Sequence, residues 1–124
     1  MKKDEIELFD KVQSQMEEMY NEVSILSKKS QNDALNEFKL HFVNNLLEDA
    51  NRLLNEKYKP FNEFKQFDKD KIPTNSDVVM VLSQYLACLE KMKIDNIESS
   101  LGTCYWKIDN KVSNIKTNRP KRFS

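Results

Sequence analysis

The single histidine, His41, is the first residue to consider for acid–base chemistry. At 100° per residue it shares a helix face with Glu37, Asn45 and Glu48, on the polar side of its segment. No nucleophile or second acid–base group can be paired with its imidazole in a pocket. A ferritin-like metal site needs Glu-x-x-His, and residue 38 is Phe. We therefore expect His41 to be a solvated surface residue.

The acidic side chains and the cysteines give no stronger signature of catalysis or metal binding than His41 does. Glu17 and Glu18 precede Glu22, but with three residues between instead of the two that the magnesium pattern of all-α pyrophosphohydrolases requires. Cys88 and Cys104 form no CxxC pair, and neither lies near a histidine in the sequence. One glycine excludes a glycine-rich phosphate loop. These observations predict a protein that is not an enzyme, with no catalytic residue, metal, cofactor or small-molecule substrate.

The strongest electrostatic feature is the C-terminal end. From Leu101 onward there are six basic residues and one acidic residue, whereas residues 1–100 are net acidic. Basic side chains here are able to contact phosphates or an acidic protein surface, and Tyr105 and Trp106 to stack on bases beside them. Basic ends also occur simply as solubilising tails, and an acidic body opposes nucleic acid. The candidate basic contacts are Lys116, Arg119, Lys121 and Arg122.

Three long helices are predicted to position these groups. Over residues 4–28, apolar residues alternate at spacings of three and four, which indicates an uninterrupted amphipathic helix. This pattern fits either one helix of a bundle or a dimeric coiled coil, and Leu8 and Tyr20 widen the apolar stripe in favour of the bundle. The repeating residues are Phe9, Val12, Met16, Met19, Val23 and Leu26.

The second and third helices are predicted from capping boxes. The spacing of Ser30 and Asp33 opens a helix that runs to about Lys57, and its broad apolar arc favours a central position. The short connection before it predicts antiparallel packing on the first helix. A stronger capping box, Thr74 to Asp77, opens a third helix over 76–99 that ends at Leu101-Gly102. Its first turns are apolar almost all round, which requires deep burial or a second subunit.

The 58–75 connection carries three aromatic residues, Phe61, Phe64 and Phe67, at every third position. This spacing suits a short helical or 3₁₀ turn with one apolar edge. Two interpretations follow: the rings tuck over one end of the bundle, or they form an exposed aromatic rim that grips a partner.

A small C-terminal β-hairpin over about 103–116 is predicted from two β-forming runs that flank Asp109-Asn110. Asp and Asn tolerate positive φ, so a two-residue type I′ turn fits between the runs. An isolated hairpin is marginal in water. It must therefore dock on the bundle through Trp106, Ile108 or Tyr105, or pair with another chain.

The chain is thus predicted to be mainly α: an antiparallel three-helix bundle with long helices, an aromatic-rich 58–75 connection and a small C-terminal β-hairpin. We expect a single domain over 1–117 and a basic tail over 118–124. One glycine in 124 residues argues against most all-β folds. The predicted core contains Met16, Phe42, Leu46, Leu82 and Leu89.

These features favour a small helical protein–protein interaction module, acting as an adaptor or a subunit of a larger complex and capable of forming a homodimer. The alternative is a nucleic-acid-associated regulator that contacts phosphates weakly through the hairpin and basic tail. No apolar run approaches the roughly 18 residues of a membrane span, so we expect no membrane partner. Two isolated cysteines suggest a reducing compartment, and we expect a cytoplasmic protein.

Overall fold

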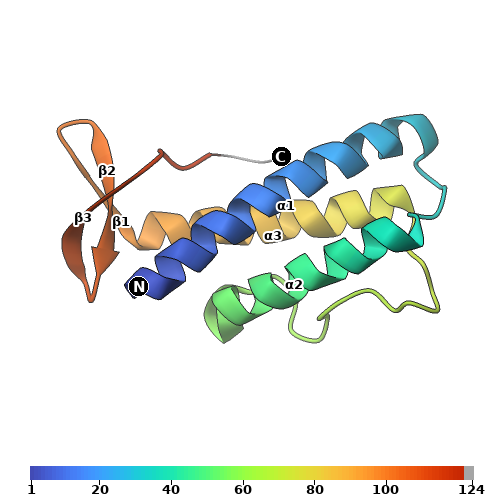
Figure 1. Cartoon of the computed structure of the whole chain (residues 1–124), viewed down its shortest axis with the longest axis horizontal. Coiled ribbons are helices and arrows are strands. Elements are labelled where there is room, and N and C mark those ends of the chain that lie inside the picture. Colours follow the sequence, from blue (N-terminus) through green and yellow to red (C-terminus); the bar gives the residue numbers. More distant parts are fainter. Residues whose placement is uncertain (122–124) are drawn as a thin grey trace.

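The computed structural model describes residues 1–121 and shows three helices beside a small antiparallel sheet (Figure 1). The sheet lies at the end of the helices where the chain starts. Within residues 1–121, no helix is both long and apolar enough to cross a membrane. The prediction of a mainly helical fold is confirmed. In chain order the elements are α1 (Lys3–Ser30), α2 (Glu37–Tyr58), α3 (Asn75–Asp95), β1 (Ile97–Ser100), β2 (Thr103–Ile108) and β3 (Lys111–Thr117).

The starts of α2 and α3 have side-chain caps, although the cap of α2 differs from the prediction. At the start of α3, the Thr74 hydroxyl accepts a hydrogen bond from the Asp77 amide at 3.2 Å, as its capping box predicted. The predicted cap at Ser30 was wrong, because α1 itself continues through that residue. The cap of α2 is Asn36, whose side chain accepts from the Lys39 amide at 2.7 Å. Asparagine is among the best N-cap residues, so α2 starts after Asn36 and not after Ser30.

The helix directions agree with an antiparallel bundle only in part. The Asn75 side chain donates to the carbonyl oxygen of Ser30 at 3.0 Å, so α3 begins where α1 ends and runs back along it. A β-bridge between Ala34 and Thr74 places the starts of α2 and α3 together. At their other ends, the Tyr58 hydroxyl donates to Asp95 at 2.9 Å. Therefore α2 and α3 are parallel, and α1 runs opposite to both (Figure 1).

The return segment, residues 59–74, makes the parallel arrangement possible by running back along α2. Two asparagines of α2 hold it. Asn44 pairs with both backbone groups of Phe67, at 2.9 and 3.1 Å. Asn51 donates to the Lys65 carbonyl at 2.9 Å and accepts from the Tyr85 hydroxyl at 2.6 Å. These bonds satisfy backbone groups that the segment cannot satisfy itself.

The sheet has three strands in the order β1-β2-β3, all antiparallel. The predicted hairpin over about 103–116 is therefore confirmed only in part. Its turn at Asp109-Asn110 has positive φ at both residues, 52° and 65°, as a type I′ turn requires. The third helix was predicted to reach residue 99, but it ends at Asp95. Leu101-Gly102 does not cap it; with φ of 51° and 81°, these residues form a second tight turn, between β1 and β2.

The core joins all three helices to the sheet through Trp106, whose side chain is fully buried. Its ring meets that of Phe9 edge to face, with centroids 5.0 Å apart. Of the three residues proposed to dock the hairpin, Trp106 is the most deeply buried. The four aliphatic members of the predicted core are buried, but Phe42 is 44% exposed, which corrects that prediction. The broad apolar arc of α2 extends past the faces that α1 and α3 cover.

We expect Trp106→Ala to lower the free energy of unfolding by about 3–5 kcal/mol, because it leaves a large cavity beside Phe9. The matched control is Tyr105→Ala on the opposite face of the same strand, which should cost about 1 kcal/mol or less. Urea unfolding followed by circular dichroism measures both. Equal losses for the two variants would contradict the docking role of Trp106.

Candidate functional site

The aromatic residues of the return segment are packed rather than displayed. Phe61, Phe64 and Phe67 are each half-buried against the core. They form an edge-to-face series, with neighbouring centroids 5.7 and 5.2 Å apart. Phe61 continues the series to Tyr85 of α3 at 6.2 Å. The rings thus lie along the bundle and fix the return segment, which favours the packed interpretation over an exposed rim.

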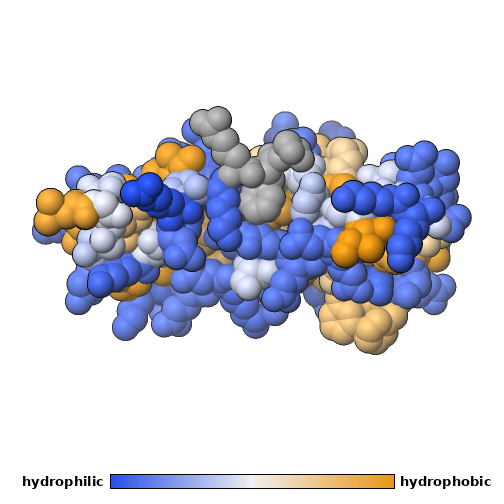
Figure 2. All heavy atoms as spheres, turned by 90° about the horizontal axis from the view of Figure 1, so that it is seen from above, coloured by the Kyte–Doolittle hydropathy of each residue, from blue (hydrophilic) through white to orange (hydrophobic). Residues whose placement is uncertain are grey.

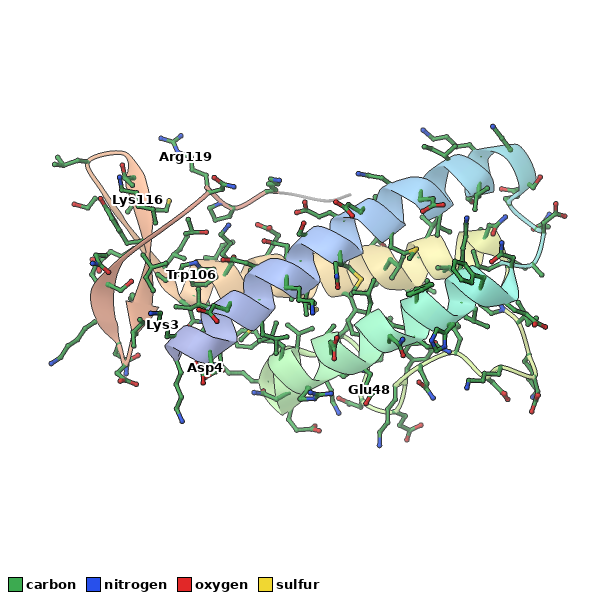
Figure 3. The ribbon with its side chains drawn as sticks, in the orientation of Figure 1. Lys3, Asp4, Glu48, Trp106, Lys116 and Arg119 are labelled. Carbon is green, nitrogen blue, oxygen red and sulfur yellow. The ribbon has the colours of Figure 1, made fainter. Side chains whose placement is uncertain are left out.

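The aromatic residues of the sheet face opposite ways. Trp106 is fully buried under the sheet, so its ring is not accessible for stacking on a base. Tyr105 is half-buried and lies directly opposite Lys116 in the register of β2 and β3. Figure 3 shows Trp106 between the sheet and the helices. Of the two stacking candidates, only Tyr105 retains exposed surface.

The basic residues of the C-terminal end do not gather into one patch. Lys116 and Arg119 are exposed, and Arg119 points away from the helices (Figure 3). The ammonium of Lys121 lies 3.6 Å from a carboxylate oxygen of Glu17 on α1. Arg122 lies outside the described residues. One of the candidate cations is therefore already paired within the chain.

A polar cleft lies where residues 118–121 run back from β3 over the helices (Figure 1). We call it the tail cleft. Its volume is about 410 Å³. The lining residues come from α1 (Asp10, Gln13, Ser14 and Glu17), α3 (Glu90 and Lys93) and the C-terminal segment (Lys116, Thr117, Asn118 and Lys121).

Glu90 is a buried carboxylate in this cleft, 6% exposed. One of its oxygens accepts a hydrogen bond from the Gln13 side chain at 2.7 Å, and the other accepts from the Lys121 backbone amide. Burial raises the pKa of Glu90, while these hydrogen bonds and the charge of Lys93 act to lower it. Glu90 therefore attaches the C-terminal segment to α3.

Lys93, one turn further along α3, is 5% exposed. Its ammonium lies 5.9 Å from the centroid of the Trp106 ring. Within residues 1–121, no carboxylate oxygen lies within 4.0 Å of it. Burial lowers the pKa of Lys93, and the more distant charges of Glu90 and Asp10 only partly offset that effect. The side chain is a buried cation without a contact ion pair.

A second depression lies between α1 and α2 on another side of the molecule. We call it the α1–α2 groove, and its volume is about 260 Å³. Apolar atoms come from Met19, Phe42 and the buried Leu46, and carboxylates stand beside them. The remaining lining residues are Gln15, Glu18, Glu22, Asn45 and Asp49.

An exposed aromatic pair extends this groove along α2. Phe38 is 73% exposed and meets Phe42 edge to face, with centroids 5.0 Å apart. On α1, Ile25 is 56% exposed and lies three residues after Glu22, on the same helix face. Figure 2 shows apolar surface within the hydrophilic covering near the end of the molecule where α1 ends and α2 begins.

A larger cavity, of about 530 Å³, lies between α2 and the return segment. The charged groups in its wall pair with one another. Lys59 lies 2.7 Å from Glu56, and Arg52 lies 3.7 Å from Glu48. Two acidic and two basic side chains in the wall of this cavity are therefore already paired within the chain.

No protein-family model, curated protein or solved structure matches this chain. Within residues 1–121, no group of three or more His, Cys, Asp or Glu side chains could hold a metal ion. His41 is exposed on α2, and its ring lies 3.4 Å from the Asn45 amide, as its place on the polar face predicted. The geometry of the two depressions is thus the basis for a functional proposal.

Sequence reasoning missed Gln13, Glu90 and Lys93, which the structure brings together in the tail cleft. A signal was present: Lys93 lies seven residues after the fully buried Leu86, so it continues the buried stripe of α3. A charge on such a stripe indicates a polar contact inside the fold. The sequence does not show that the C-terminal segment lies over Lys93.

We expect Lys93→Met to leave the protein at least as stable as wild type at neutral pH, because methionine fills similar space without a charge to desolvate. The pKa of Lys93 lies below its usual 10.5, so its charge costs stability at low and neutral pH. That cost disappears as pH rises from the lowered value to 10.5, and the difference between variant and wild type should shrink over this range.

Urea unfolding at neutral pH and at about pH 10.5 measures this difference. The matched control is Lys111→Met at the exposed first residue of β3, where no difference with pH is expected. A Lys93→Met protein that is less stable than wild type at neutral pH, with a gap that stays constant, would contradict the interpretation.

Proposed function

We propose that this protein is a small cytoplasmic protein–protein interaction module without catalysis, and that the α1–α2 groove is its docking surface. The observation that carries the proposal is the exposure of Phe38 and Phe42 beside an apolar groove. Large aromatic side chains are the commonest anchors of protein interfaces when a partner removes them from water. The free thiols of Cys88 and Cys104 support the reducing compartment.

The partner that best fits the groove is an amphipathic helix with a basic edge. Two antiparallel helices leave between them a channel in which a third helix can place its apolar side chains. Carboxylates of Glu18, Glu22 and Asp49 flank the apolar lining. Lys39 lies 2.8 Å from Glu22 and Arg52 lies 3.6 Å from Asp49, which leaves Glu18 as the rim carboxylate without an ion pair within residues 1–121. Lysine or arginine along the edge of the partner helix would complement it.

Self-association through the same face is less favourable. A second copy would present its own acidic rim to this one, and like charges at an interface oppose binding. A different protein with basic residues therefore fits this surface better than a homodimer.

The alternative, contact with nucleic acid through the sheet and tail, is supported by the exposed side of β2 and β3. There Tyr105 lies beside Lys116, and Lys107 follows on the same strand. The burial of Trp106 and the pairing of Lys121 with Glu17 reduce the stacking and charge that this function would use. We therefore rank it second.

Photocrosslinking tests the interaction surface directly. A photoreactive phenylalanine analogue at position 42 should give a discrete adduct in the cells that make this protein. Phe38→Ser in the same chain should reduce the adduct yield severalfold, since the loss of an aromatic anchor costs about 2 kcal/mol of binding. Because Phe38 is 73% exposed, the substitution should leave thermal stability nearly unchanged.

The matched control is Val112→Ser, which alters an exposed apolar residue on β3, outside the lining of the groove. It should leave the adduct yield as in the parent chain. The absence of any adduct, or an equal loss with both substitutions, would contradict the proposal. An adduct of twice the chain mass would favour the homodimer, and an adduct with nucleic acid would favour the alternative.

A further inference from the structure

A buried lysine in the tail cleft is not used by the docking proposal. Lys93 is 5% exposed, and its side chain contributes to the lining of the cleft. Its ammonium lies 5.9 Å from the centroid of the Trp106 ring, and within residues 1–121 no carboxylate oxygen lies within 4.0 Å of it. Because burial removes the hydration that stabilises an ammonium, a lysine in this position favours its neutral amine. The neutral amine is the form of lysine that acts as a nucleophile.

The charged groups around Lys93 come from four parts of the chain. Asp10 of α1, Glu90 of α3 and Cys104 of β2 favour the ammonium, and Lys121 of the C-terminal segment opposes it. Burial has a larger effect than any of these groups, so the pKa of Lys93 lies below its usual 10.5. At neutral pH a greater fraction of this side chain is therefore uncharged than of an exposed lysine.

The cleft provides space for a small molecule beside this amine, with a volume of about 410 Å³. Its lining has three carboxylates and three lysines, so a neutral polar molecule suits it better than an ion does. The hydroxyls of Ser14 and Thr117 and the amide of Asn118 line it as well, and these groups bond to carbonyl and hydroxyl oxygens without a charge. Aldehydes and ketones are neutral molecules that react reversibly with a lysine amine. An aldehyde, whose carbonyl carbon is the less crowded, suits an amine that is 5% exposed.

We propose that the tail cleft binds small polar aldehydes, which form a reversible imine with the side-chain nitrogen of Lys93. The nitrogen attacks the carbonyl carbon, and one amine hydrogen moves to the carbonyl oxygen to give a hydroxyl. This hydroxyl leaves with the second amine hydrogen as water, and a C=N bond remains. The step needs no oxidant or reductant, and water reverses it. The cleft and the α1–α2 groove share no lining residue, so this inference does not rest on the docking proposal.

Reductive trapping in the full chain tests this site. The probes are glycolaldehyde and propanal, which have equal numbers of heavy atoms but end in a hydroxyl and a methyl group respectively. Sodium cyanoborohydride converts each imine to a stable amine, and peptide mass spectrometry measures the yield at each lysine. At neutral pH we expect glycolaldehyde to label Lys93 at least about five times faster than the exposed Lys111, because each unit of lower pKa raises the neutral fraction about tenfold. This ratio should fall as the pH rises toward about 10.5, where exposed lysines also lose their charge.

Two comparisons show whether the reactivity depends on the folded cleft. In denaturing guanidinium chloride, Lys93 and Lys111 should be labelled equally, because neither is then buried. In the folded protein, Thr117→Val should lower the labelling of Lys93 by glycolaldehyde and leave its labelling by propanal unchanged, because the substitution removes a hydroxyl at nearly constant shape. The matched control is Thr103→Val on β2, outside the lining of the cleft, which should change neither rate.

Labelling of Lys93 no faster than that of Lys111 at neutral pH would overturn the site, as would equal rates at Lys93 in the folded and the unfolded chain. Faster labelling by propanal than by glycolaldehyde would overturn the preference for a polar aldehyde. The Phe38→Ser protein should be labelled like wild type, so a failure of the docking proposal would leave this result unaffected.

Discussion

The fold depends on how the return segment is held against α2. Residues 59–74 bring the chain back to the end where α2 began, so α3 must run parallel to α2. A segment without regular structure leaves its backbone groups in need of partners. Asn44 and Asn51, two turns apart on α2, provide several of them, and the phenylalanine series fills the space between. These contacts act together with the Ala34–Thr74 bridge and the Asn75–Ser30 hydrogen bond, which hold the start of α3 beside the end of α1 and the start of α2.

The sequence predicted those elements of the fold that short stretches of residues determine by themselves. Apolar periodicity predicted the three helices, a capping box the start of α3, and Asp109-Asn110 the turn between β2 and β3. The sequence predicts a helix up to residue 99, where the structure has the strand Ile97–Ser100, because no local pattern there distinguishes a helix from a strand. These residues form a strand because they pair with β2, and the tight turn at Leu101-Gly102 places β2 beside them.

The candidate surfaces were harder to predict because each is made by elements distant in sequence. The apolar arc of α2 predicted contact on two sides but did not show where neighbouring helices stop, which left Phe42 in the predicted core instead of on the surface. Lys93 lies on a buried stripe, yet only the fold shows that Trp106 and the C-terminal segment cover it. A charge on an apolar stripe is thus a useful signal even where its partner cannot be named.

Part of the charge difference between the acidic body and the basic C-terminal end is balanced by contacts within the molecule. The basic C-terminal end lies against the acidic α1 and α3, where Lys121 contacts Glu17 through its side chain and Glu90 through its backbone. A cation engaged in this way contributes less to a nucleic acid contact, because the contact would first have to break the pair. The same arrangement leaves Glu18, the next residue on α1, about 100° around the helix in the α1–α2 groove. The helix α1 therefore separates the tail cleft, whose three carboxylates and three lysines balance in charge, from the α1–α2 groove, whose lining carries carboxylates and no basic residue.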